Sequence, residues 1–223
     1  TFDKAKKVEL EIKHANQELV DLKRLHDERG DEVADVVVDG FERVEARIKR
    51  VADRAESLSE VDAPRREVVI EKILDSEIKR QKIFEHIEHE TKDERVLERV
   101  AEVREKLVDH VGEVFEDIPV EEDLFERVLD RQRGSEFKDL RNLEVLKRIE
   151  ERVPEQAREA IRGAQERAFE RMRDRIHDFG DEDHERFEEY LEDFRGDEVA
   201  RFELLDQFEH QFDDKELPDE LRN

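Results

Sequence analysis

The chain has 223 residues, of which 49% are charged and 35% are hydrophobic, and its formal net charge is −25 at pH 7. This charge argues against binding to nucleic acid or to anionic membranes, and no run of 18 apolar residues exists that would span a bilayer. The absence of cysteine excludes disulfides, thiolate metal sites and a cysteine nucleophile. Apolar residues recur at helical spacing almost throughout, so we expect long amphipathic helices rather than disorder.

Residues 3–29 and 31–59 are predicted to form the first two helices, joined at the sequence RGDE. Asp3 is a suitable N-cap for the first helix, and Gly30 is a suitable stop after it. The apolar residues are spaced alternately by four and three, which predicts an antiparallel helical hairpin. Gly40, inside the second helix, indicates a close approach of another helix. The two apolar stripes are Val8, Ile12, Ala15, Leu19 and Leu22, then Val33, Val37, Phe41, Val44, Ile48, Val51, Ala55 and Leu58.

The next segment, residues 64–117, leaves two alternatives open. Pro64 is well placed as the first residue of a third helix. Two apolar stripes follow, and the segment EHETKDER between them contains no apolar residue. Either one helix of roughly 80 Å runs through, at 1.5 Å per residue, or the helix breaks near Thr91. We expect a continuous or kinked helix.

Further helices are predicted after the turn EDIPVEED and after Pro154. Residues 181–223 differ from the rest, because residues 181–222 hold 18 acidic and 5 basic residues and carry two short aromatic motifs. We therefore expect an all-α, elongated bundle of long antiparallel helices with coiled-coil-like hairpins. Its expected divisions are an N-terminal hairpin at 1–62, a long-helix bundle at 63–180, and an acidic, aromatic-rich end at 181–223.

Two segments carry a resemblance to a known family. The first is TFDKAKKVELEIKHANQELVDLKRL with the helix that follows RGDE, over residues 1–58. The second is NLEVLKRIEERVPEQAREAIRGAQERA, over residues 142–168, with its proline between helices. Together they resemble an uncharacterised helical domain family of exported bacterial and archaeal proteins. The resemblance implies an extracellular or cell-envelope protein without known activity, and it supplies no catalytic residues. Since the chain begins at Thr1, we expect any targeting signal to lie upstream.

One cluster suggests metal chemistry. His89 and Glu90 follow His86 by three and four residues, so that all three can share one face of a helix. Imidazole together with carboxylate suits Zn²⁺ or a similar divalent ion. A tight site needs a further ligand, which a second helix would have to supply. The alternative is a solvated face that pairs with Arg80 and Lys82.

The acidic end offers two further patterns. Asp174, His177, Asp181 and His184 are spaced by three, four and three residues, but Gly180 interrupts the helix between them, which favours a capped acidic turn over a Ca²⁺ or Mg²⁺ site. The aromatic stripe that includes Phe187 is typical of a local core. Its alternative is an exposed patch for a partner or for self-association.

No phosphate-binding glycine loop and no Ser-His-Asp arrangement exists in the sequence. We therefore expect a non-enzymatic structural or protein-interaction module of the cell envelope or extracellular space, acting through a protein partner or self-association, without nucleic acid and without direct membrane insertion. The alternative function is divalent-metal binding or sensing through His86, His89 and Glu90. We expect no cofactor other than such a metal.

Overall fold

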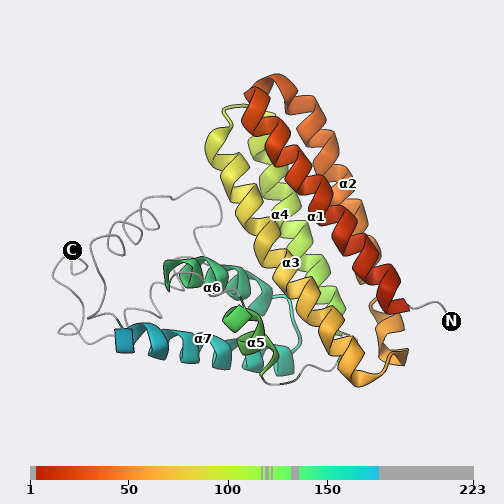
Figure 1. Cartoon of the computed structure of the whole chain (residues 1–223), viewed down its shortest axis with the longest axis vertical. Helices are drawn as coiled ribbons and strands as arrows, with labels where there is room; N and C mark the ends of the chain where they lie inside the picture. The colour runs from red at the N-terminus through yellow and green to blue at the C-terminus, as the bar shows by residue number, and fades with distance from the viewer. Residues whose placement is uncertain (1–3, 117, 119–120, 122, 132–135, 176–223) are drawn as a thin grey trace.

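The computed structural model describes residues 4–116, 118, 121, 123–131 and 136–175, and these residues form helices and turns with no β-strand among them. The expected all-α class is therefore confirmed. Four long helices lie side by side in Figure 1: α1 (Lys4–Arg29), α2 (Ala34–Ala52), α3 (Ala63–Glu90) and α4 (Glu94–Glu116). Three further helices, α5 (Leu124–Arg131), α6 (Glu136–Glu150) and α7 (Glu155–Arg175), pack at one end of this bundle.

The four long helices form a ring in which α1 packs against α2 and α3, and α4 packs against the same two helices. Side-chain pairs show the directions of neighbouring helices. Asn16 of α1 bonds to Ser76 of α3, and further along both helices Asp27 contacts His86, so α1 and α3 run the same way. Glu18 of α1 pairs with Arg47 of α2, which returns alongside it. Each half of the bundle is thus a pair of helices joined by a short turn.

The first turn is the 3₁₀ segment η1 (Gly30–Val33). Gly30 has φ = 57°, a left-handed conformation that glycine adopts without steric cost, so its predicted role as a helix stop is confirmed. A second 3₁₀ segment, η2 (Glu56–Glu60), leads to α3. The side chain of Asp62 accepts a hydrogen bond from the backbone N–H of Arg65 at 3.3 Å and caps α3, with Pro64 in the first turn as expected.

The expectation of a continuous or kinked helix over 64–117 is wrong. The helix ends at Glu90, Thr91 has extended backbone angles, and α4 begins at Glu94 and returns along α3. The carboxylate of Asp93 accepts from the backbone N–H of Arg95 at 2.9 Å and satisfies a free donor at the start of α4. Turning here allows the second apolar stripe, which begins at Val96, to pack inside the bundle instead of extending beyond it.

The bundle interior holds two clusters of buried side chains. One lies toward the η1 end and includes the edge-to-face pair Phe41 and Phe84, whose ring centres are 5.3 Å apart. The other lies toward the η2 end and continues into α5, α6 and α7 through residues such as Phe125 and Phe169. Gly40 packs against the buried side chain of Leu22, which confirms the predicted close approach.

The helices α1 and α2 of the predicted hairpin pack lengthwise against α3 and α4. The division into three domains stays a prediction, and the acidic end at 181–223 lies outside the described residues. None of the described helices is both long and apolar enough to cross a bilayer.

Candidate functional site

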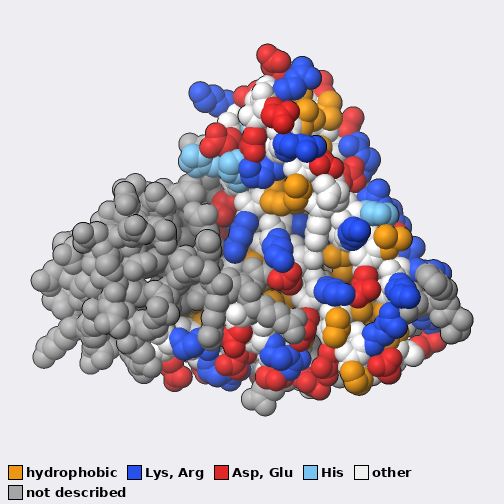
Figure 2. All heavy atoms as spheres, viewed as in Figure 1, with side chains coloured by type: hydrophobic (Ala, Val, Ile, Leu, Met, Phe, Trp, Pro, Cys, Tyr) orange, Lys and Arg blue, Asp and Glu red, His pale blue; other side chains and the backbone are white. Residues whose placement is uncertain are grey.

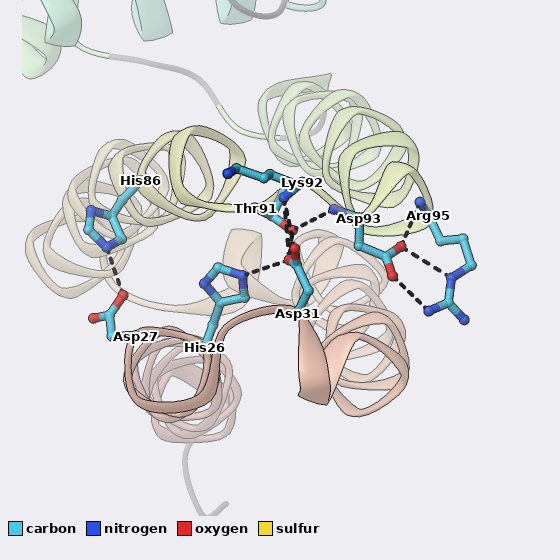
Figure 3. A network of polar contacts seen from close by, with 8 residues as sticks. All are labelled: His26, Asp27, Asp31, His86, Thr91, Lys92, Asp93 and Arg95. Atoms are coloured by element: carbon cyan, nitrogen blue, oxygen red, sulfur yellow. Dashed lines mark hydrogen bonds and ion pairs between the residues drawn. The ribbon is translucent and has the colours of Figure 1, made fainter.

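The two turns at one end of the bundle are tied together by Asp31 of η1. Its carboxylate accepts a hydrogen bond from the hydroxyl of Thr91 at 2.6 Å and a second from the backbone N–H of Lys92 at 3.2 Å (Figure 3). The Thr91 hydroxyl in turn accepts from the N–H of Asp93 at 3.3 Å. These hydrogen bonds, the one from Thr91 first, lower the pKa of the Asp31 carboxyl. The contact joins the two helical hairpins.

His26 lies beneath this junction. It is 2% exposed, and neither ring nitrogen has a hydrogen-bond partner among the described residues. Its Nε2 atom lies 3.7 Å from Oδ1 of Asp31, which is an ion-pair distance for a protonated imidazole and too long for a hydrogen bond (Figure 3). The imidazole is therefore a buried polar group whose nearest polar neighbour is already bonded to the opposite turn.

The three predicted metal ligands lie near this end of α3. His86 points toward α1, where its Nε2 atom is 2.8 Å from Oδ1 of Asp27 (Figure 3). His89 is 59% exposed, and its Nδ1 atom is 3.3 Å from Oε1 of Glu90. Although partial burial acts to raise it, hydrogen bonds from Lys23 and His86 leave the pKa of Asp27 lowered. The structure thus pairs His86 with a carboxylate from a second helix and His89 with its own neighbour.

Within the part of the chain that is described, no three His, Asp or Glu side chains come together in a way that could hold a metal ion. Metal binding by His86, His89 and Glu90 stays a prediction. Asp27 is the carboxylate from a second helix that contacts His86, and sequence reasoning could not name it. The second candidate cluster, from Asp174 to His184, extends beyond the described residues.

A chain of buried polar side chains crosses from α1 through α3 to α4. Arg80 is 1% exposed and donates to the buried carboxylate of Glu77 at 2.7 Å and to Oδ1 of Asn16 at 2.8 Å. The amide of Gln81 donates to Glu77 at 2.6 Å and accepts from Arg104 of α4 at 2.9 Å. Each member therefore bonds the next, as buried charges require.

The far end of this chain is the ion pair between Arg104 and Glu88, whose atoms are 2.6 Å apart. Burial raises the pKa of the Glu88 carboxyl in spite of the opposing charge of Arg104. Burial likewise lowers the pKa of the Arg104 guanidinium. Both shifts show that removal from water opposes the charged forms here, so the pair depends on its mutual hydrogen bond.

The opposite end of the polar chain reaches the surface in a groove of about 510 Å³ between α1 and α3. At its floor, Asn16 donates to the Ser76 hydroxyl at 3.0 Å and accepts from Arg80, which fixes both side chains. Lys72 pairs with Glu9 at one side of the groove. The remaining lining includes Lys13, Gln17 and Val20.

The face around this groove is unusual in hydrophobicity and charge. Four large hydrophobic side chains are exposed among the described residues, and three of them, Leu10, Val20 and Val68, lie on α1 and α3. These two helices hold 13 basic and 13 acidic residues, so the net charge of −25 arises elsewhere in the chain. Figure 2 shows Lys and Arg side chains spread along this face with hydrophobic ones between them.

Sequence reasoning missed the groove and the buried polar chain. Glu77, Arg80 and Gln81 look like ordinary surface residues in a chain that is half charged. A signal existed on the outer face of α1, where Leu10, Lys13, Gln17 and Val20 repeat at spacings of three and four, a second stripe opposite the core stripe. Comparison with protein-family models, curated proteins and solved structures gives no match.

Proposed function

We propose that this chain is a non-enzymatic protein-interaction module whose recognition surface is the α1/α3 face, defined by the groove and the exposed residues Leu10, Val20 and Val68. The observation that carries the proposal is the concentration of exposed apolar side chains on α1 and α3, two helices whose basic and acidic residues balance. Exposed apolar side chains that are grouped and surrounded by polar ones mark interaction surfaces. A role in the cell envelope or extracellular space, expected from the family resemblance, belongs to the same proposal.

A photoreactive amino acid introduced at single positions tests this function. Val20 lies in the groove, whereas Val36 is an equally exposed valine on α2 and serves as a matched control. The full chain carrying the probe at either position is irradiated in an extract of its source, and any adduct is identified and then reconstituted from purified components. We expect a specific adduct from Val20 that Val36 does not give. The same adducts from both positions, or none from Val20, would contradict the proposed surface.

The narrow apolar stripes also support the finer part of the expected fold, an elongated shape with coiled-coil-like hairpins. Analytical ultracentrifugation measures this directly through the frictional ratio. We expect a value above that of a compact sphere of the same mass, and a value typical of a compact monomer would rule the elongated shape out.

Divalent-metal binding or sensing is the alternative function. The observation in its favour is that Asp27 faces His86 from a second helix. Calorimetric titration with Zn²⁺ and Ca²⁺ decides between the two functions, and the variant His86→Ala is the control for the site. Absence of heat at millimolar metal would end this alternative, whereas heat that persists in the variant would place the metal elsewhere.

A further inference from the structure

We infer that the α1/α3 groove binds an amphipathic α-helix of a partner protein, with apolar residues at the ends of its docked face and carboxylates between them. This inference rests on the proposed function and adds the chemistry of the partner. A third helix can bind in the groove between two parallel helices, which is a common mode of peptide recognition. The side chains along the groove decide what kind of helix fits.

Apolar side chains lie toward the two ends of the groove. Val20 of α1 is 47% exposed, and Ile83 of α3, on the same side, is partly buried against the core cluster beside it. At the other end Val68 of α3 is 45% exposed, and Leu10 is exposed on the outer face of α1. Leu10 and Val20 are ten residues apart, about 15 Å along the helix, which equals almost three turns of a docked helix.

Cations lie between these apolar ends. Lys13 lines the groove and has no ion pair among the described residues. Lys72 and Lys79 project from α3, where they pair with Glu9 and Asp75. A carboxylate above Lys13 would therefore gain a partner without displacing another acid. Such an exposed pair contributes little by itself, but it sets the register and orientation of the docked helix.

Among the carboxylates of α1, Glu9 lines the groove, where Lys72 offsets its charge, and two others face α2 instead. Glu11 pairs with Arg50 and Arg54 of α2, and Glu18 pairs with Arg43 and Arg47. The basic and acidic residues of α1 and α3 balance, so the net charge of −25 lies outside these two helices, and residues 181–222 account for −13 of it. Charge therefore favours the α1/α3 groove over other surfaces for an acidic partner.

The test uses fluorescence anisotropy with a synthetic helical peptide of about 18 residues, long enough to span the groove at 1.5 Å per residue. One face of the peptide has Leu toward its ends and Glu between them, and the control peptide has Lys in place of every Glu. The chain of 223 residues is compared with two charge reversals, Lys13→Glu in the groove and Lys7→Glu on the same helix outside the groove lining. Circular dichroism establishes that both variants keep the helical content of the parent chain.

We expect the parent chain to bind the Glu peptide, and to bind the Lys peptide at least tenfold more weakly. Lys13→Glu should weaken binding of the Glu peptide about tenfold, whereas Lys7→Glu should change it less than twofold. Equal effects of the two reversals, equal binding of the two peptides, or no binding would overturn the inference. Concentration-dependent dimerisation that Lys13→Glu abolishes would overturn it in favour of a second copy of the chain. A specific adduct at Val20 combined with no binding of the Glu peptide would refute the acidic partner and leave the proposed surface standing.

Discussion

The carboxylate of Asp31 accepts a hydrogen bond from the hydroxyl of Thr91 at 2.6 Å, across 60 residues of sequence. This contact connects the turn of one helical hairpin to the turn of the other. Asp31 also accepts from the N–H of Lys92, so it satisfies a backbone donor in the turn between α3 and α4. Together with the contacts Asp27–His86 and Asp35–Arg95, Asp31 thus holds the two hairpins together at this end of the bundle.

Replacing Asp31 by Asn should lower the melting temperature at neutral pH, because an amide accepts hydrogen bonds more weakly than a carboxylate. The pKa of Asp31 is lowered in the folded chain, so its contribution is complete above the unfolded pKa of about 4 and is lost as the pH falls through the lower folded value. The difference between parent and Asp31→Asn should shrink below about pH 4. Thermal melts between pH 2 and pH 7 measure it, with Glu32→Gln as the neighbouring control. A difference that stays constant with pH would contradict this role.

His26 should be replaceable by Leu without loss of stability. A buried polar group without a hydrogen bond costs about 1–3 kcal/mol, and both ring nitrogens of His26 are in that condition among the described residues. We expect His26→Leu to raise the free energy of unfolding by about 1 kcal/mol. Urea denaturation measures this change. The exposed His89→Leu should stay within about 0.5 kcal/mol of the parent, and a clear loss of stability in His26→Leu would show that the imidazole is needed.

Arg104→Met should be strongly destabilising, by about 3 kcal/mol, because it leaves the carboxylate of Glu88 buried without its partner. The double variant Arg104→Met with Glu88→Met removes both charges and should recover part of that loss. Chemical denaturation of the two single variants and the double variant gives the coupling free energy. Arg95→Met, which removes an exposed guanidinium, is the control and should have a much smaller effect. Additive effects at Arg104 and Glu88 would show that the pair is not coupled.

Two glycine-to-alanine substitutions should act with opposite signs. At Gly112 of α4 an added Cβ would lie 2.6 Å from the backbone oxygen of Arg152, so the backbone would have to move, at a cost of about 1–3 kcal/mol. At Gly163 of α7 the nearest atom is the end of the flexible Arg167 side chain at 3.3 Å. There we expect the better helix propensity of alanine to stabilise by up to about 1 kcal/mol. Thermal melts of both variants check the signs, and a stabilising Gly112→Ala would show that α4 and the turn between α6 and α7 do not approach so closely.

Much of the helical pattern could be predicted because it depends on short-range properties. The spacing of Val8, Ile12 and Leu19 places them on one face of the helix, and this face is buried whichever helix packs against it. Glycine at position 30 permits a left-handed turn that other residues adopt only at a steric cost. Pro154 likewise precedes a helix for local reasons, and α7 begins at Glu155.

The candidate site was predicted only in part. His86 is near a carboxylate as its sequence neighbourhood indicated, but that carboxylate is Asp27, 59 residues earlier. The groove could not be predicted from the sequence, because it is formed by residues of both α1 and α3 and exists only when these helices lie side by side.

By itself, the sequence determined that the chain is helical, which face of the first helices is apolar, and that α1 ends at Gly30, since these follow from backbone sterics and the helical period. Only the tertiary structure decided that the chain turns back at Thr91. Glu, Lys and Arg around Thr91 tolerate a continuing helix, and the turn gains its advantage from the contact with Asp31 and from burial of Val96 and the stripe after it against α2 and α3. Tertiary structure also decided that Arg80 and Arg104 are buried with partners, because the attraction of distant charges matters only after the helices have been brought together.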